Sequence, residues 1–240
     1  QLPTQPTQRM TQQQVMIPAA PPVATGPTEA SIVKQQLNRA FQLCRTNPAE
    51  ADNEFVRSLR YIATAHDTAE GLNTYGEALE RGFSTLDEAE RIQTALIEEG
   101  EDAAIELAHT FSGDVSKSFA EGKIGASEVI DAYHLYARHS LAIAIGTQSL
   151  GSQALYGWGQ LCSSRAQTNG FDSDVERNKA VTLLTASLEA DNDNWRAHNE
   201  LGIAYARNGE YAKSEKSLRR SLALQPQAET YNNIAKVMER

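Results

Sequence analysis

The feature that most constrains this chain is a stretch near its C-terminal end, residues 194–226. Small and apolar residues recur in both halves of the stretch with the 3.6-residue spacing of one helix face. They are Ala197, Leu201, Ala204 and Tyr205 in the first half, and Tyr211, Ser214, Leu218, Ser221 and Leu222 in the second. Gly209 follows the first half, where a left-handed helix end is favoured, and Pro226 ends the second. Two such short helices cannot bury their apolar faces alone, so the pattern predicts stacked neighbours.

The same stretch carries a spaced motif with weaker copies on either side. The motif is His198-x2-Leu201-Gly202-x2-Tyr205, then Ser214-x3-Leu218, then Pro226. The copies are Tyr231-x2-Ile234-Ala235-x2-Met238 downstream, and Leu155-x2-Trp158-Gly159-x2-Cys162 with Ala180-x3-Leu184 upstream. The motif resembles the tetratricopeptide repeat, whose pattern is W-x2-L-G-x2-Y, then A-x3-F, then P. Leu201, Gly202, Tyr205 and Pro226 match that pattern, whereas His198, Ser214 and Leu218 depart from it. The resemblance covers residues 155–240 and not the chain before them.

This resemblance implies an all-α fold, a right-handed superhelical stack of antiparallel helix pairs. It also implies a protein–protein interaction scaffold that holds an extended peptide in a concave groove, without an enzymatic step. By the resemblance, exposed residues on the first helix of each repeat line the groove. They are Arg196, Asn199, Ile203 and Arg207, then Asn232, Asn233, Lys236 and Arg240, and in the upstream copy Gln153, Tyr156, Gln160 and Ser163. Their amides and cations suit peptide carbonyls and carboxylates, although a merely solvated helix face is the alternative.

The rest of the chain divides by composition into a tail and further helices. Residues 1–27 are rich in Gln, Pro and Thr, which predicts a disordered tail. We expect degenerate helical repeats over 28–150 and the tetratricopeptide-like repeats over 151–240. The expected helices span 28–46, 48–65, 67–82, 85–100, 102–121, 127–145, 152–167 and 174–190. Two of these boundaries rest on Gly82 as a helix end and on Thr85-x-x-Glu88 as a capping box that opens the next helix.

The charge of the chain bears on possible partners. The formal net charge is −9, which argues against a nucleic-acid partner, because phosphate binding needs a basic surface. Eight acids stand between residues 87 and 106 against Arg91 alone, and they form either a solvated face or a contact for a basic partner. No apolar run reaches the roughly 18 residues of a membrane span. The partner we expect is therefore a protein or peptide, and the oligomeric state stays open.

No residue pattern predicts catalysis or metal binding. His134 and His139 are the only close pair of histidines, and a spacing of five puts them on different helix faces, unlike zinc ligands. Cys44 and Cys162 read as small apolar residues of helix cores. We expect no catalytic residue, no metal and no cofactor.

The two ends of the sequence leave further alternatives open. Gln1 predicts either processing after export, which would place the protein outside the cytoplasm or in the periplasm, or excision from a longer, possibly cytoplasmic chain. The helical pattern reaches Arg240 without a cap, from which we expect the native chain to continue. Two other functions remain: a structural subunit within a larger envelope or secretion-related assembly, and an appendage of an enzyme whose catalytic domain lies beyond residue 240.

Overall fold

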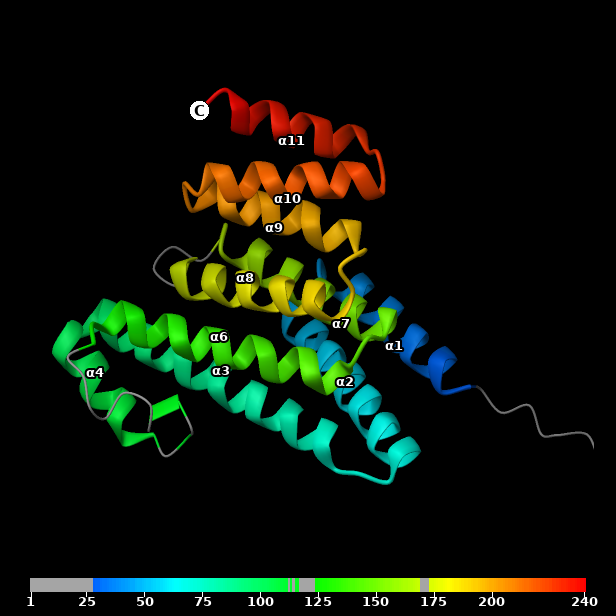
Figure 1. The fold of residues 1–240 in the computed structure, drawn as a ribbon, viewed down its shortest axis with the longest axis horizontal. Helices are drawn as coiled ribbons and strands as arrows, with labels where there is room; N and C mark the ends of the chain where they lie inside the picture. The colour runs from blue at the N-terminus through cyan, green and yellow to red at the C-terminus, as the bar shows by residue number, and fades with distance from the viewer. Residues whose placement is uncertain (1–27, 112, 114, 117–123, 169–172) are drawn as a thin grey trace, which may run out of the picture.

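The computed structural model describes residues 28–240 except 112, 114, 117–123 and 169–172. The predicted disordered tail, residues 1–27, lies outside the described residues. The described part is all-helical, and its ten helices pack against one another (Figure 1). They are α1 (Glu29–Leu43), α2 (Pro48–Glu70), α3 (Thr74–Glu98), α4 (Glu101–Thr110), α6 (Ala126–Ile145), α7 (Ser149–Arg165), α8 (Ser173–Ala190), α9 (Trp195–Arg207), α10 (Tyr211–Leu224) and α11 (Ala228–Met238). None of these described helices is both long enough and apolar enough to cross a membrane.

The first two helices begin at capping residues. The Thr28 hydroxyl accepts a hydrogen bond from the Ser31 backbone N–H, and α1 starts at the next residue, Glu29. The Asn47 side chain accepts from the backbone N–H of Glu50, with Pro48 at the first helical position. The second helix runs five residues beyond the expected 48–65 and ends where Gly71 adopts a left-handed φ of 68°.

The predicted helix break at residues 82–85 is wrong, because α3 is one continuous helix of 25 residues. Gly82 lies inside it, and a Cβ placed there would stand 2.8 Å from Leu141 Cγ of α6. Thr85 is buried in the same helix and caps nothing. The glycine therefore serves close packing of α3 on α6 and does not end a helix. The helix expected at 102–121 ends at Thr110, and much of its second half lies outside the described residues.

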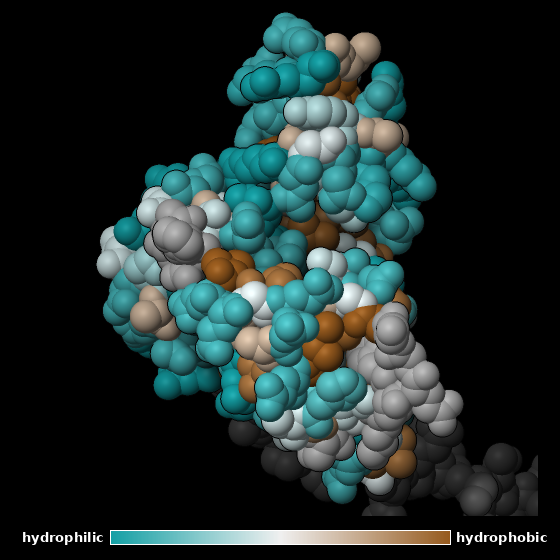
Figure 2. Space-filling model, turned by 90° about the vertical axis from the view of Figure 1, so that its left-hand side faces the viewer, coloured by the Kyte–Doolittle hydropathy of each residue, from teal (hydrophilic) through white to brown (hydrophobic). Residues whose placement is uncertain are grey.

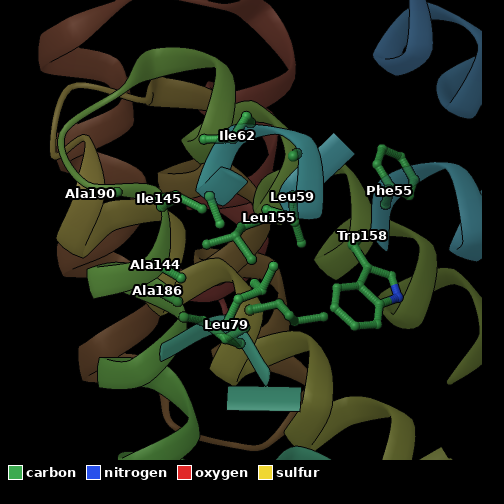
Figure 3. Close-up of a cluster of buried hydrophobic side chains, with 14 of the residues drawn as sticks. Phe55, Leu59, Ile62, Leu79, Ala144, Ile145, Leu155, Trp158, Ala186 and Ala190 are labelled. Carbon is green, nitrogen blue, oxygen red and sulfur yellow. The ribbon is translucent and has the colours of Figure 1, made fainter. Parts of the chain in front are cut away.

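The main core joins the N-terminal helices to the later ones. Side chains from α1, α2, α3, α6, α7 and α8 form one buried cluster (Figure 3). Phe55 and Leu59 of α2 meet Leu155 and Trp158 of α7 there, next to Leu79 of α3. A second buried cluster lies between the end of α3, α4 and the start of α6. Helices α9, α10 and α11 are layered beyond α7 and α8 (Figure 1).

Two consecutive helix pairs are built around the same contact. A Cβ on Gly159 of α7 would lie 2.9 Å from Leu184 Cγ of α8 and 3.3 Å from the Ala180 carbonyl oxygen. A Cβ on Gly202 of α9 would lie 2.6 Å from Leu218 Cγ of α10 and 3.2 Å from the Ser214 carbonyl oxygen. The two glycines hold matching places in the sequence motif, and so do the leucines. This recurrence, with α11 packed on α10, is compatible with a helical repeat fold.

Candidate interaction groove

A hollow of about 640 Å³ opens between the C-terminal end of α1, α7, α9 and the start of α11. Its walls are mainly polar, with Gln42 from the first helix, Gln160, Ser163, Ser164 and Gln167 from α7, and Glu200 from α9. Arg45, in the turn after α1, and Arg207, in the last turn of α9, also line it. Amide and hydroxyl side chains can both donate to and accept from a peptide backbone. The lining is therefore suited to a ligand that presents its own backbone.

A second hollow of about 610 Å³ lies between α9, α10 and α11. Ile203, Arg207 and Glu229 line both hollows, so the two are neighbours that share a wall. We call the two neighbouring hollows together the interhelical groove. It runs from the end of α1 to the end of α11.

The acidic side of the first hollow is partly desolvated. Gln160 Nε2 donates to Glu200 Oε1 over 3.2 Å. Burial raises the pKa of Glu200, and the nearby Glu229 charge raises it further. The Gln160 hydrogen bond and the Arg207 charge act in the opposite direction and lower this pKa. Tyr156 lies buried beside the hollow, with its ring 6.1 Å from that of Phe41. Burial, reinforced by the Glu200 charge, raises the pKa of Tyr156 to about 12.

Four cations that line the groove have no hydrogen-bond or ion-pair partner among the described residues. In the part of the chain that the structure describes, the side chains of Arg45, Arg207, Lys236 and Arg240 make no hydrogen bond or ion pair. Only two acids, Glu200 and Glu229, line the two hollows. The groove is thus net cationic on a chain whose formal net charge is −9. Such a local excess attracts anionic groups against the field of the whole protein.

The residues expected to form the peptide-binding face divide into three sets. Gln160, Ser163, Ile203 and Arg207 line the first hollow, and Ile203, Arg207, Asn233, Lys236 and Arg240 line the second. Arg196, Asn232 and Gln153 are exposed but lie outside both hollows. The Arg196 guanidinium instead covers the ring of Trp195, at 4.6 Å from its centroid. The structure therefore gathers about half of the expected face.

The exposure expected for Asn199 and Tyr156 is wrong, because both are buried. Asn199 Oδ1 accepts from Thr230 Oγ1 over 3.0 Å and from Asn233 Nδ2 over 3.3 Å. It thereby joins α9 to α11, and Thr230 is itself 1 % exposed. Tyr156 is covered because Phe41 of α1 packs on it. Asn199 and Tyr156 support the groove from beneath.

Sequence reasoning missed the wall that α1 contributes. Gln42 of α1 and Arg45 of the turn that follows it lie outside the repeat-like region, and no motif connects them to it. The first helix reaches the groove through core packing, where the rings of Phe41 and Phe55 meet edge to face at 5.4 Å. Glu200 and Glu229 were also missed, although both stand on helices that carry the repeat pattern.

A network of charged side chains fastens the N-terminal helices to α7 and α8. Trp158 Nε1 donates to Asp52 Oδ1 over 2.7 Å, and Arg165 pairs with the other oxygen of Asp52. On the other side of Trp158, Lys179 of α8 pairs with Glu90 of α3 over 2.5 Å and lies over the indole ring. These contacts fix the helices that carry the groove walls. Partly buried pairs of this kind add little net stability, because the cost of removing the charges from water offsets much of their attraction.

Neither cysteine has the lowered thiol pKa of a catalytic nucleophile, and no metal site is evident in the described residues. Cys162 is fully buried, and desolvation raises the pKa of its thiol well above the ordinary value. Cys44 lines the first hollow, and burial followed by the Asp52 charge raises the pKa of its thiol as well. Among the residues described, no group of three His, Cys, Asp or Glu side chains is placed to hold a metal ion.

No protein-family model, no curated protein and no solved structure matches the chain. The class is therefore defined by the fold and the groove alone. The protein is an all-helical assembly of packed helices, compatible with a helical repeat fold, with a net cationic groove along one side.

Proposed function

We propose that this chain is a tetratricopeptide-like interaction scaffold that binds an extended segment of a partner protein in the interhelical groove. In this proposal α7–α8, α9–α10 and α11 form a right-handed superhelical stack. The observation that carries the proposal is the row of two neighbouring hollows along α7, α9 and α11, which share Ile203, Arg207 and Glu229 as lining residues. An extended chain needs a long polar channel of this kind, whereas a small ligand needs one enclosed pocket.

The repeated glycine–leucine contact supports the repeat part of the proposal. The matching contacts of Gly159 with Leu184 and of Gly202 with Leu218 place successive pairs in the same internal packing. Stacked pairs with equal internal packing present the same face of each first helix to one side. The groove residues of α7, α9 and α11 belong to those first helices.

The alternative of a structural subunit expects one large exposed apolar surface. Exposed large apolar side chains are instead distributed over several elements, namely Leu72, Ile97, Leu135, Ile143, Tyr211, Tyr231 and Met238. On the face shown in Figure 2, hydrophilic residues prevail and hydrophobic ones form small separate groups. This distribution favours the groove as the interaction site. The enzyme-appendage alternative concerns sequence beyond residue 240 and is compatible with the same groove.

A displayed library of random twelve-residue peptides tests the proposal. Binders selected on the full chain should lose affinity for Gln160→Ala and Arg207→Ala variants by about tenfold each, since each change removes a polar contact to the ligand. Lys216→Ala is the matched control, because Lys216 is exposed on α10 outside both hollows. Binders that respond to Lys216→Ala as strongly as to Arg207→Ala would refute the proposal, and so would a library that yields no binder.

A further inference from the structure

The second hollow combines an apolar floor with a cationic rim. Ile203 and Ala206 of α9 and Val237 of α11 supply apolar surface to it, and the fully buried Leu218 of α10 lies beneath. Tyr211, at the start of α10, borders the same space and is 41 % exposed. A volume of about 610 Å³ lies within the range of natural ligand pockets. The floor can therefore take a large apolar side chain.

The rim carries three cations and one acid. Arg207, Lys236 and Arg240 line the hollow with Glu229, and none of the three cations makes an ion pair within the described part of the chain. Arg207 and Lys236 stand in the last turns of α9 and α11, where a positive charge also offsets the helix dipole. That interaction leaves their N–H groups free to donate. Guanidinium and ammonium groups in this state pair most strongly with carboxylates.

We infer that the second hollow selects an acidic segment, one in which a large apolar side chain is flanked by Asp or Glu residues. The inference rests on the proposed function and names the chemistry of its ligand. The apolar side chain enters between Ile203 and Val237, and the flanking carboxylates reach Arg207, Lys236 and Arg240. A basic segment would leave these cations unpaired and add repulsion.

The net charge of the protein decides between a peptide and a nucleic acid as the polyanion. A chain of net charge −9 repels a polyphosphate backbone as a whole and tolerates a short segment with a few carboxylates at a local cationic rim. The hollow also offers an apolar floor, which a sugar–phosphate chain does not need. The ligand is therefore an acidic peptide segment.

Three synthetic peptides, each labelled with fluorescein, test the inference by anisotropy with the full chain. The first has Phe between acidic triplets (GDEDFDEDG), the second replaces Phe by Gly (GDEDGDEDG), and the third replaces the acids by amides (GNQNFNQNG). We expect the first to bind about tenfold more tightly than either of the others, because each change removes one of the two contributions. Arg240→Ala and Lys236→Ala should each weaken it severalfold, and Lys216→Ala should not. Raising the salt concentration should weaken it as well.

The outcomes separate this inference from the proposed function. Equal binding of the amide peptide, lost on Arg207→Ala, would overturn the acidic preference and leave the groove as the binding site. Equal binding of the peptide without Phe would overturn the role of the apolar floor. A single-stranded oligothymidine that binds as tightly as the first peptide would overturn the choice of a peptide ligand. If none of the three peptides binds while library-derived binders still need Arg207, the inference fails and the proposed function stands.

Discussion

Replacing Gly202 by Ala should destabilise the protein, although the same change usually stabilises a helix. Alanine gains about 1 kcal/mol over glycine in helix propensity. Against this gain, the new Cβ would lie 2.6 and 2.8 Å from two side-chain carbons of Leu218 and 3.2 Å from the Ser214 carbonyl oxygen. Leu218 is fully buried, so it can yield to the new Cβ only by shifting within packed surroundings, and the Ser214 carbonyl oxygen belongs to the backbone. With about 2–3 kcal/mol for such overpacking, the net loss is about 1–2 kcal/mol, and Gly202→Leu should lose more.

The sign should reverse when the obstructing side chain is removed. In a Leu218→Ala background the Cβ meets no leucine and keeps only the 3.2 Å contact with the Ser214 carbonyl oxygen, so Gly202→Ala should stabilise by up to about 1 kcal/mol. Ala235 supplies the control for helix propensity, because it holds the matching place on α11 and is exposed. Ala235→Gly should cost about 1 kcal/mol at most. The free energies come from urea unfolding followed by far-ultraviolet circular dichroism. A Gly202→Ala protein at least as stable as the wild type, with no dependence on residue 218, would refute the packing of the α9–α10 pair.

Three further predictions concern titration and the seam between α9 and α11. Because folding raises the pKa of Glu200, ionisation of its carboxylate lowers the stability of the folded chain as pH rises. The Glu200→Gln variant should therefore be more stable than the wild type at pH 7 and as stable as the wild type near pH 3. A variant that matches the wild type at both pH values would contradict the burial of this group. Burial and, after it, the Lys179 charge lower the pKa of His134 to about 4. Between pH 6.5 and 4 the folded chain therefore keeps this histidine neutral while the unfolded chain protonates it, and the free energy of unfolding should fall by up to about 3 kcal/mol. His134→Gln should flatten that slope in urea midpoints, and an unchanged slope would assign the acid sensitivity elsewhere. Asn199→Ala should cost about 1–3 kcal/mol of stability, because two hydrogen bonds are lost. Asn232 is exposed, so Asn232→Ala should change stability by no more than about 0.5 kcal/mol. Similar losses for the two variants would mean that Asn199 does not join α9 to α11.

The helix pairs over 194–226 could be predicted because their local signals agree with their packing. The leucine, glycine and proline spacing of this stretch reflects contacts between helices adjacent in sequence. Gly82 misled the prediction for a related reason, since its close contact is with Leu141, 59 residues away, and local sequence cannot distinguish a packing glycine from a helix-ending one. The all-helical content was confirmed, while the handedness of the stack stays a prediction.

The groove could be predicted only in part, because its wall is assembled from distant segments. The resemblance to the tetratricopeptide repeat implied Gln160, Arg207, Asn233 and Lys236 as residues of the binding face. Arg45 was not, since α1 joins the groove through aromatic packing between Phe41 and Phe55. The resemblance also implied exposure of Asn199 and Tyr156, but Thr230 and Asn233 of α11 bond Asn199, and Phe41 of α1 packs on Tyr156.

Protection of Cys44 tests the central claim most directly. Cys44 lines the first hollow and is partly exposed, whereas Cys162 is fully buried, so a thiol reagent applied to the folded chain should modify Cys44 alone. The rate is followed by mass spectrometry of the intact protein, with and without a saturating library-derived peptide. If an extended segment occupies the groove, the bound peptide should slow modification of Cys44 severalfold, and Arg207→Ala should restore the rate at the same peptide concentration. Modification at an unchanged rate in the peptide complex would show that the ligand binds elsewhere and would contradict the proposed function.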